Sequence, residues 1–230
     1  MEVIRPARVH PDSVVCDSSA IITLTDAGLL GALISTKMKM KGELLVTKGV
    51  VDESVTYPLK VPEYSFSAIR IERALNSKMF RVVEYSNSTL DKVLHSANNM
   101  FYTDRPFHLV DEGEAEMIAA AVDNGLKVIL MDERTTRALI ESPLNLKSHL
   151  EEEFRIKINV NEDMLNQFKS MTKGLQVIRS AEIVALAREK GYFKKFKELA
   201  GAAYEAALYA VKFRGCSIGF DEIKELAKLA

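Results

Sequence analysis

The sequence is poor in cysteine and tryptophan and has no long apolar run. It contains no tryptophan and only two cysteines, Cys16 and Cys216, which lie near opposite ends of the chain and form no CxxC motif. We therefore expect reduced thiols in a cytoplasmic protein. No apolar run reaches the roughly 18–20 residues that a bilayer-spanning helix needs. Residues 1–13 carry charges and prolines in place of the apolar stretch of a secretory signal. The sequence thus predicts neither membrane association nor secretion.

Several common catalytic and cofactor motifs are also missing. There is no GxGxxG after a strand and no GxxxxGK[ST], so dinucleotide binding and P-loop chemistry are not indicated. The chain has no GxSxG elbow and no HExxH motif, and its four histidines are scattered. A lone loop histidine such as His108 is more often a surface residue than a catalytic one.

The charges nearly cancel, with 31 basic and 32 acidic residues and a net charge of −1. The chain as a whole therefore does not attract nucleic acid strongly. Two local runs are basic, at 37–41 and 188–197, and each is either a solvated surface or a local contact for a polyanion. The remaining composition, 47% hydrophobic and 27% charged over 230 residues, is typical of a globular protein with a full core.

Short apolar runs alternate with helical patterns along most of the chain. The runs that read as strands lie at 13–17, 43–47, 79–85, 127–132 and 175–180, with an alternating edge strand at 154–160. Helical spacing covers 18–33, 50–55, 66–76, 88–101, 114–125 and 133–140, and helices return at 181–193, 196–213 and 221–230. This alternation predicts an α/β fold with a central parallel sheet covered by helices on both faces.

Acidic residues follow several of these strands. Asp17 ends the first strand, Asp132 ends the strand at 127–132, and Glu53 lies just past the strand at 43–47. The segment DEGEAE, residues 111–116, adds four more acids immediately before an alanine-rich helix. In a parallel sheet the carboxyl ends of the strands meet at one edge, where such folds bind ligands. We therefore expect Asp17 and Asp132 to emerge at the same edge.

Each acid alone has a structural explanation. Asp17 and Asp132 are suitable helix N-caps, and Glu53, Glu114 and Glu116 suit the first turn of a helix, where the dipole favours them by about 0.3–1 kcal/mol each. As a group they are harder to explain, because several buried carboxylates repel one another unless a cation neutralises them. Oxygen ligands without histidine or cysteine suit Mg²⁺ or Mn²⁺. Such a carboxylate cage is what two-metal phosphodiester chemistry uses.

Four segments together resemble a known family. VVCDSSAIITL, ELLVTKGVVDESV, DEGEAEMIAAA and VILMDERTTR are similar, in order and character, to the motifs of the PIN-domain nucleases, and the GEAE motif resembles the branch that includes VapC-type toxins. The resemblance implies a three-layer α/β/α fold that binds Mg²⁺ or Mn²⁺ and cleaves single-stranded RNA. It also leaves open a homodimer and an antitoxin-like protein partner.

The resemblance also implies roles for individual residues. The implied metal ligands are Asp17, Glu53, Glu114, Glu116 and Asp132, and the implied catalytic residues are Asp17, Glu53, Glu114 and Asp132. Ser19 matches the hydroxyl residue that follows the first aspartate in the family. Two roles stay open for Ser18 and Ser19: they hydrogen-bond a carboxylate, a metal-bound water or a phosphate, or they cap the helix. Arg134, Arg137 and Arg179 either hold a phosphate or form salt bridges. Glu133 stands where close relatives have an aspartate, so its role as a ligand stays open.

The resemblance covers 13–137 and, more loosely, 175–200. We predict a PIN-like domain at 1–200 with an insertion at about 141–174, followed by a helical extension at 201–230 packed on it. The leading hypothesis is a metal-dependent endoribonuclease. The alternative is a PIN-fold module that binds RNA or protein without cutting, and a toxin of a toxin–antitoxin pair is a further hypothesis.

Overall fold

The computed structural model of the protein describes residues 3–4, 9–37 and 41–228. Its centre is a six-stranded sheet in the order β1-β4-β3-β2-β6-β8, in which all neighbouring strands are parallel. The strands are β1 (Val3–Ile4), β2 (Val14–Cys16), β3 (Leu44–Val46), β4 (Phe80–Val83), β6 (Val128–Leu130) and β8 (Gln176–Ile178). The predicted parallel sheet is confirmed, and the sequence pattern missed only its edge strand β1.

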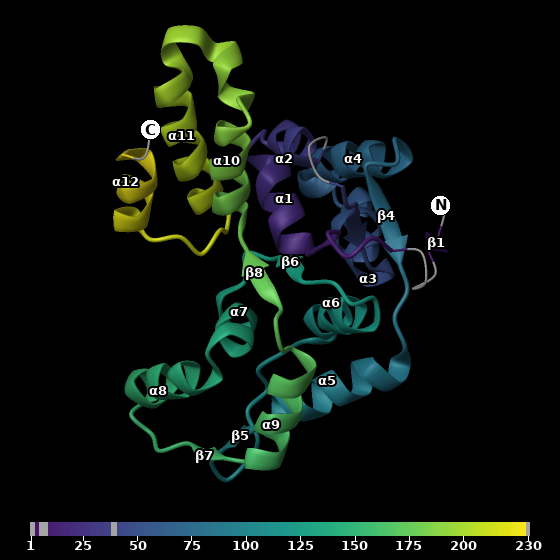
Figure 1. Cartoon of the computed structure of the whole chain (residues 1–230), viewed down its shortest axis with the longest axis vertical. Coiled ribbons are helices and arrows are strands. Elements are labelled where there is room, and N and C mark those ends of the chain that lie inside the picture. Colours follow the sequence, from purple (N-terminus) through teal and green to yellow (C-terminus); the bar gives the residue numbers. More distant parts are fainter. Residues whose placement is uncertain (1–2, 5–8, 38–40, 229–230) are drawn as a thin grey trace.

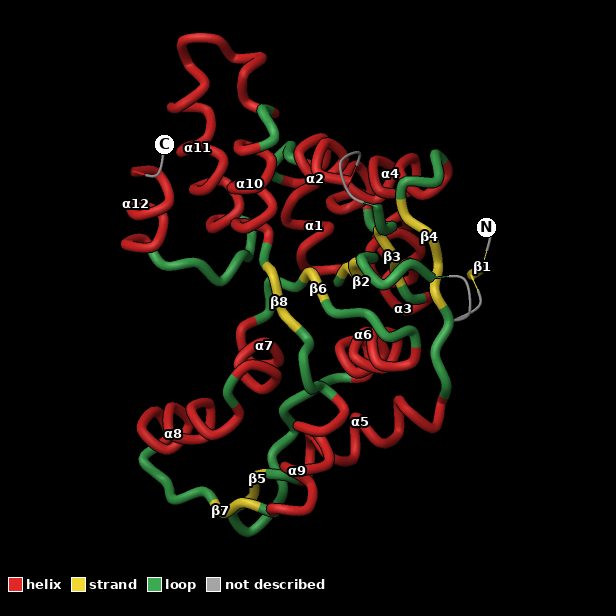
Figure 2. Tube along the Cα trace, viewed as in Figure 1, coloured by secondary structure: helices red, strands yellow, loops and turns green. Residues whose placement is uncertain are grey.

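Helices cover both faces of this sheet (Figure 1). One side carries α1 (Ser18–Asp26), α2 (Leu30–Lys37), α4 (Pro62–Asn76) and α10 (Ser180–Glu189). The other side carries α5 (Asn87–Asn99), α6 (Glu112–Asp123) and α7 (Arg134–Glu141). Figure 2 shows the strands as a row between these two helical layers. The three-layer α/β/α fold predicted from the sequence is therefore confirmed.

The central strands are buried on both faces, which explains their continuous apolar sequences. Every residue of β2 and of β3 is buried. The alanine-rich helix α6 packs against β2 and β6, and its residues Met117–Ala121 are fully buried. Small side chains let this helix approach the sheet closely, so the apolar run after DEGEAE belongs to the core.

The helix predicted at 18–33 is two helices. The chain turns at Gly28, whose φ of +71° favours glycine, and α1 and α2 are bent by 116° relative to each other. Gly31, within the predicted range, lies inside α2. Within the described residues no single helix is long and apolar enough to cross a membrane; α1 and α2 pass that test only as a bent pair. Most of their apolar residues are buried in the core.

Residues between β6 and β8 form a lobe at one end of the molecule (Figure 1). It contains α8 (Pro143–Phe154), β7 (Asn159–Val160) and α9 (Glu162–Met171), and α9 packs on α5. The strand expected at 154–160 is only the two-residue β7, which pairs antiparallel with β5 (Phe101–Tyr102). The helix predicted at 88–101 therefore ends earlier, at Asn99.

The C-terminal residues pack along α10 (Figure 1). They form α11 (Ala200–Phe213) and α12 (Phe220–Lys228), and α11 packs against both α10 and α12. The helix predicted at 196–213 begins only at Ala200, because residues 192–199 form 3-10 turns with a non-helical residue, Lys197. Of the two basic runs, 188–197 spans the end of α10 and these turns, whereas most of 37–41 lies outside the described residues.

Candidate functional site

Asp17 lies at the carboxyl end of β2, at the centre of the predicted site. It is the N-cap of α1, and its side chain is only 6% exposed. The Ser19 hydroxyl and the Ser19 backbone N–H both donate to the Asp17 carboxylate. The same hydroxyl accepts a bond of 3.2 Å from the backbone N–H of Asp132. Ser19, predicted to bind substrate or to cap the helix, therefore links the ends of β2 and β6.

Glu53 reaches the same place from the segment after β3. Helix α3 (Lys48–Val51) runs on into a π-helical turn, Asp52–Thr56, a local widening that is frequent at functional sites. The Ser18 hydroxyl donates to Glu53 Oε2 at 2.7 Å. Glu53 Oε1 lies so close to Gly113 that a Cβ there would be 2.9 Å away. The Glu53 carboxylate thus lies between the first turns of α1 and α6.

Glu114 completes this group from the first turn of α6. It accepts a bond of 2.8 Å from the Asp111 backbone N–H, which closes a capping box. Burial raises the pKa of Glu114 to about 7, and the negative charges of Glu133 and Asp17 add to the shift. The Asp111 N–H and the nearby Thr136 hydroxyl act in the opposite direction.

Asp17 is shifted in the same way. Burial raises its pKa to about 6, and the charge of Glu53 adds to the effect, while the bonds from Ser19 oppose it. Asp17 therefore interacts unfavourably with Glu53 on one side and with Glu114 on the other. A cluster of carboxylates that resists losing its protons is a recognised mark of a functional site.

Asp132 emerges at the same sheet edge, as expected. Strands β2 and β6 are paired neighbours, and the Asp17 N–H donates to the Leu130 carbonyl at 2.8 Å. The Asp132 carboxylate is 2% exposed, and both of its oxygens accept bonds from Ser180 at the start of α10. The Cys216 thiol lies beside it, and burial together with this carboxylate raises the pKa of the thiol.

Glu116 and Glu133 are engaged with backbone N–H groups. Glu116 accepts from the Gly49 N–H at 3.2 Å in the first turn of α3 and lies beside Tyr85. Glu133 is the N-cap of α7 and accepts from the N–H groups of Thr135 and Thr136. Both acids act as helix caps, and Glu133 also adds negative charge beside Glu114.

The three arginines separate into two groups. Arg134 and Arg137 line a groove of about 300 Å³ between α7 and α8, together with His149. The Arg137 Nε is buried and has no hydrogen-bond partner among the described residues. Arg179 is instead buried in ion pairs with Glu182 and Glu222. Of the two roles that the sequence left open for Arg179, salt bridging is the one that the structure displays.

The donor chemistry of the cluster fits a divalent cation, although its geometry is not a closed cage. Asp17, Glu53 and Glu114 offer only oxygen atoms, which hard cations such as Mg²⁺ and Mn²⁺ prefer. Burial is the main reason that the pKa values of Asp17 and Glu114 are raised, and the charges of neighbouring carboxylates add to the shift. Among the described residues, however, no three His, Cys, Asp or Glu side chains are close enough together to enclose an ion.

The sequence interpretation overlooked Ser180, which lies 48 residues from its partner Asp132. One signal was present: Ser180 ends the strand predicted at 175–180 and begins a helix, as Ser18 begins the helix after β2. Cys216 and Gly113 were also missed. Their positions depend on packing between distant segments, which no local pattern reveals.

Comparison with known proteins identifies one relationship. A family model of the PIN domain matches residues 13–148, more than half of the chain. PIN domains are generally nucleases and typically use divalent metals. No match was found among curated proteins or solved structures. The matched region runs from β2 into α8 and so contains all five acids of the predicted metal site.

Proposed function

The chain belongs to the PIN-domain family, and from that premise we propose that it is a divalent-metal-dependent endoribonuclease that cleaves single-stranded RNA by attack of water on a phosphodiester. One observation carries the proposal. Asp17, Glu53 and Glu114 gather at the carboxyl edge of a parallel sheet, where the charge of Glu53 raises the pKa of Asp17 and the charge of Asp17 raises the pKa of Glu114. A fold tolerates such repulsion where a cationic ligand relieves it.

The proposed ion-binding residues are Asp17, Glu53 and Glu114, with Asp132 and Glu116 completing the set. A bound Mg²⁺ or Mn²⁺ would lower the pKa of water and stabilise negative charge on the phosphodiester. Ser19 holds the Asp17 carboxylate in one orientation through two hydrogen bonds. Arg134 and Arg137, in the groove beside α7, would bind the phosphates of the RNA strand.

A second candidate function is a PIN-fold module that binds RNA or a protein without cutting. Two observations favour it. No three acidic side chains of the described residues enclose an ion. In addition, Glu116 already accepts a hydrogen bond from the Gly49 N–H of the protein itself.

Cleavage of a labelled, unstructured RNA in Mn²⁺, Mg²⁺ or EDTA separates these functions. The wild type should cleave only with metal, and Asp17→Asn should lower the rate on the order of 100-fold or more, equivalent to about 2.7 kcal/mol of barrier. Asp91→Asn, which changes an exposed aspartate on α5, is the matched control and should cleave like the wild type.

Two results would reject the nuclease. Equal cleavage by the wild type and Asp17→Asn would mean that a contaminant is responsible. Absence of cleavage, together with absence of Mn²⁺ binding in calorimetry, would favour the binding module, which should then retain the RNA in a filter-binding assay.

A further inference from the structure

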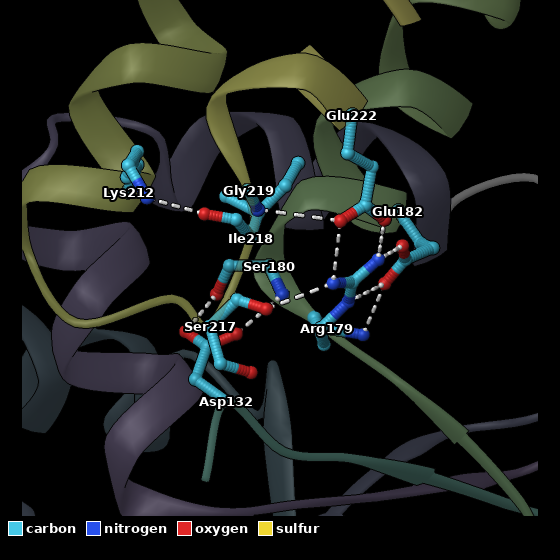
Figure 3. Close-up of polar contacts among 9 residues, drawn as sticks. All are labelled: Asp132, Arg179, Ser180, Glu182, Lys212, Ser217, Ile218, Gly219 and Glu222. Carbon is cyan, nitrogen blue, oxygen red and sulfur yellow. Dashed lines mark hydrogen bonds and ion pairs between the residues drawn. The ribbon is translucent and has the colours of Figure 1, made fainter. Parts of the chain in front are cut away.

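Ser180 supplies one hydrogen-bond donor to each oxygen of the Asp132 carboxylate, and the Cys216 thiol also lies beside that carboxylate. The Ser180 N–H donates to Asp132 Oδ1 at 2.8 Å, and the Ser180 hydroxyl donates to Oδ2 at 2.7 Å. Both residues are buried, and Figure 3 shows the two side chains facing each other. Because each oxygen is fixed by its own donor, the orientation of the whole carboxylate is determined.

Ser180 is positioned in turn by the residue before it. The Arg179 guanidinium forms ion pairs with Glu182, on the same helix, and with Glu222, on α12 (Figure 3). It also donates to the Ser217 carbonyl at 2.9 Å. These contacts join the start of α10 to the segment between α11 and α12.

Hydrogen bonds within the segment between α11 and α12 also hold it in place. The Lys212 ammonium group donates to the Ile218 carbonyl, and the Gly219 N–H donates to Glu222. Cys216, in the same segment, lies beside Asp132. The residues 212–222 therefore contact the predicted ligand directly, through Cys216, and indirectly, through Arg179 and Ser180.

The hydrogen bonds from Ser180 leave the Asp132 carboxylate able to bind a metal ion, because they do not pair it with a positive charge. The Ser180 donors are uncharged, so they orient the Asp132 carboxylate without cancelling its charge. Each carboxylate oxygen has further acceptor capacity after one hydrogen bond. Carboxylates that bind metals are commonly held by such outer hydrogen bonds, and removal of those partners typically costs 10–100-fold in metal affinity or activity.

We propose that Ser180 is a positioning residue that holds Asp132 for metal binding, and that the segment 212–222 holds Ser180 through Arg179. This inference rests on the proposed function. It implies that the C-terminal helices help to position a metal ligand, although they lie outside the residues 13–148 that match the family model.

The test compares Ser180→Ala with Ser180→Thr, which keeps the hydroxyl, and with Ser67→Ala. Ser67 also donates its hydroxyl to a carboxylate, that of Asp26, but takes no part in the predicted site. Mn²⁺ dissociation constants are measured by electron paramagnetic resonance, and RNA cleavage is measured as a function of Mn²⁺ concentration. Circular dichroism checks that each variant is folded.

Ser180→Ala should raise the Mn²⁺ dissociation constant by about 10–100-fold and should recover cleavage at saturating Mn²⁺. Ser180→Thr should stay within about threefold of the wild type, and Ser67→Ala should not change metal affinity. Glu222→Gln, at a partly exposed position, should weaken Mn²⁺ binding by a few-fold because it loosens Arg179 and through it Ser180.

The outcomes distinguish the two proposals. If the wild type binds Mn²⁺ and cleaves RNA, but Ser180→Ala and Glu222→Gln keep its metal affinity and lose only thermal stability, the positioning role is wrong and the nuclease stands. If the wild type neither binds Mn²⁺ nor cleaves, the proposed function is wrong and the positioning role falls with it.

Discussion

Two groups of carboxylates in this molecule have opposite electrostatic environments. The acid cluster at the sheet edge, Asp17, Glu53 and Glu114, has raised pKa values at Asp17 and Glu114, caused mainly by burial. The arginine clamp consists of Arg179 with Glu182 and Glu222. There the guanidinium holds the pKa of Glu222 below its ordinary value, and the two carboxylates raise the pKa of Arg179 although burial opposes them.

The contrast shows how one residue type can serve structure in one place and ligand binding in another. In the clamp, every carboxylate has a cationic partner from the protein, so the charges fasten α10 to α12. In the acid cluster, the charges that act on Asp17 and Glu114 come from other carboxylates. Such a site is less favourable in the free protein and gains most when a cation binds.

The largest expected effect comes from removing the cation of the clamp. Arg179→Met should lower the free energy of unfolding by about 3 kcal/mol, at the low end for breaking a buried ion pair, because Glu182 and Glu222 keep some contact with water. Urea denaturation followed by circular dichroism measures the change.

Lys224→Met is the control for that experiment. It breaks a pair with Asp221 in which both side chains are largely exposed, so it should lower the free energy of unfolding far less than Arg179→Met does. Equal losses from the two substitutions would show that the clamp contributes no more than a surface salt bridge.

The two groups should also respond to pH in opposite directions. Folding raises the pKa of Asp17 from 3.8 to about 6 and the pKa of Glu114 from 4.5 to about 7. The protonated carboxyls therefore favour the folded state, and their contribution to stability is complete below the unfolded pKa values. It is lost as the pH rises through 6 and 7. The pKa of Glu222 is lowered, so its contribution is present above pH 4.5 and is lost as the pH falls further.

At about 1.4 kcal/mol per pKa unit the two shifts would correspond to about 6 kcal/mol, and solvent screening of the partly exposed Glu114, together with the repulsion that the two carboxylates share, reduces this by about half. Metal-free protein should therefore lose about 2–3 kcal/mol of unfolding free energy between pH 4.5 and 8 because of the acid cluster. Chemical denaturation at a series of pH values, in EDTA and in Mn²⁺, measures this slope. Mn²⁺ should flatten the slope, and so should Asp17→Asn in EDTA. A slope that is the same in all three samples would contradict the assigned environment of Asp17.

The smallest effect comes from one substitution made in both groups. Glu114→Gln should raise the unfolding free energy of the metal-free protein at pH 8 by about 1 kcal/mol, since it removes an unfavourable charge that solvent screens at this partly exposed position. Glu222→Gln should lower it by about 0.5–1 kcal/mol, a value limited by the partial exposure of this pair. Thermal denaturation of the two variants side by side gives the signs. The same sign for both would mean that the two environments do not differ.

Much of the fold was predictable because it depends on short-range patterns. The apolar runs at 13–17, 43–47 and 127–132 became strands of a parallel sheet, and the acids that follow β2 and β6 emerge at one edge. Prediction was poorer where the pattern was ambiguous. The helical spacing at 18–33 did not show that the chain turns at Gly28, because both halves are apolar and both are buried.

The candidate site was predictable in composition but not in arrangement. The spacing of residues along the chain placed Glu114 and Glu116 together in one helical turn. Two residues apart on a helix, however, side chains point to different sides. Glu114 lies near Asp17, and Glu116 caps α3. The identity of the clamp partners was equally hidden, since Glu222 lies 43 residues from Arg179.

Residue patterns alone thus established the strands and the acids at their carboxyl ends, because strand periodicity and helix capping depend on neighbours within a turn or two. The family of the fold was indicated by the resemblance of four motifs to those of PIN domains. Tertiary structure decided which acids repel one another, which one has an arginine, and which serine orients Asp132. Those outcomes depend on burial and on charges brought together from distant segments. Desolvation and Coulomb interactions act through space, so only the packed chain defines them.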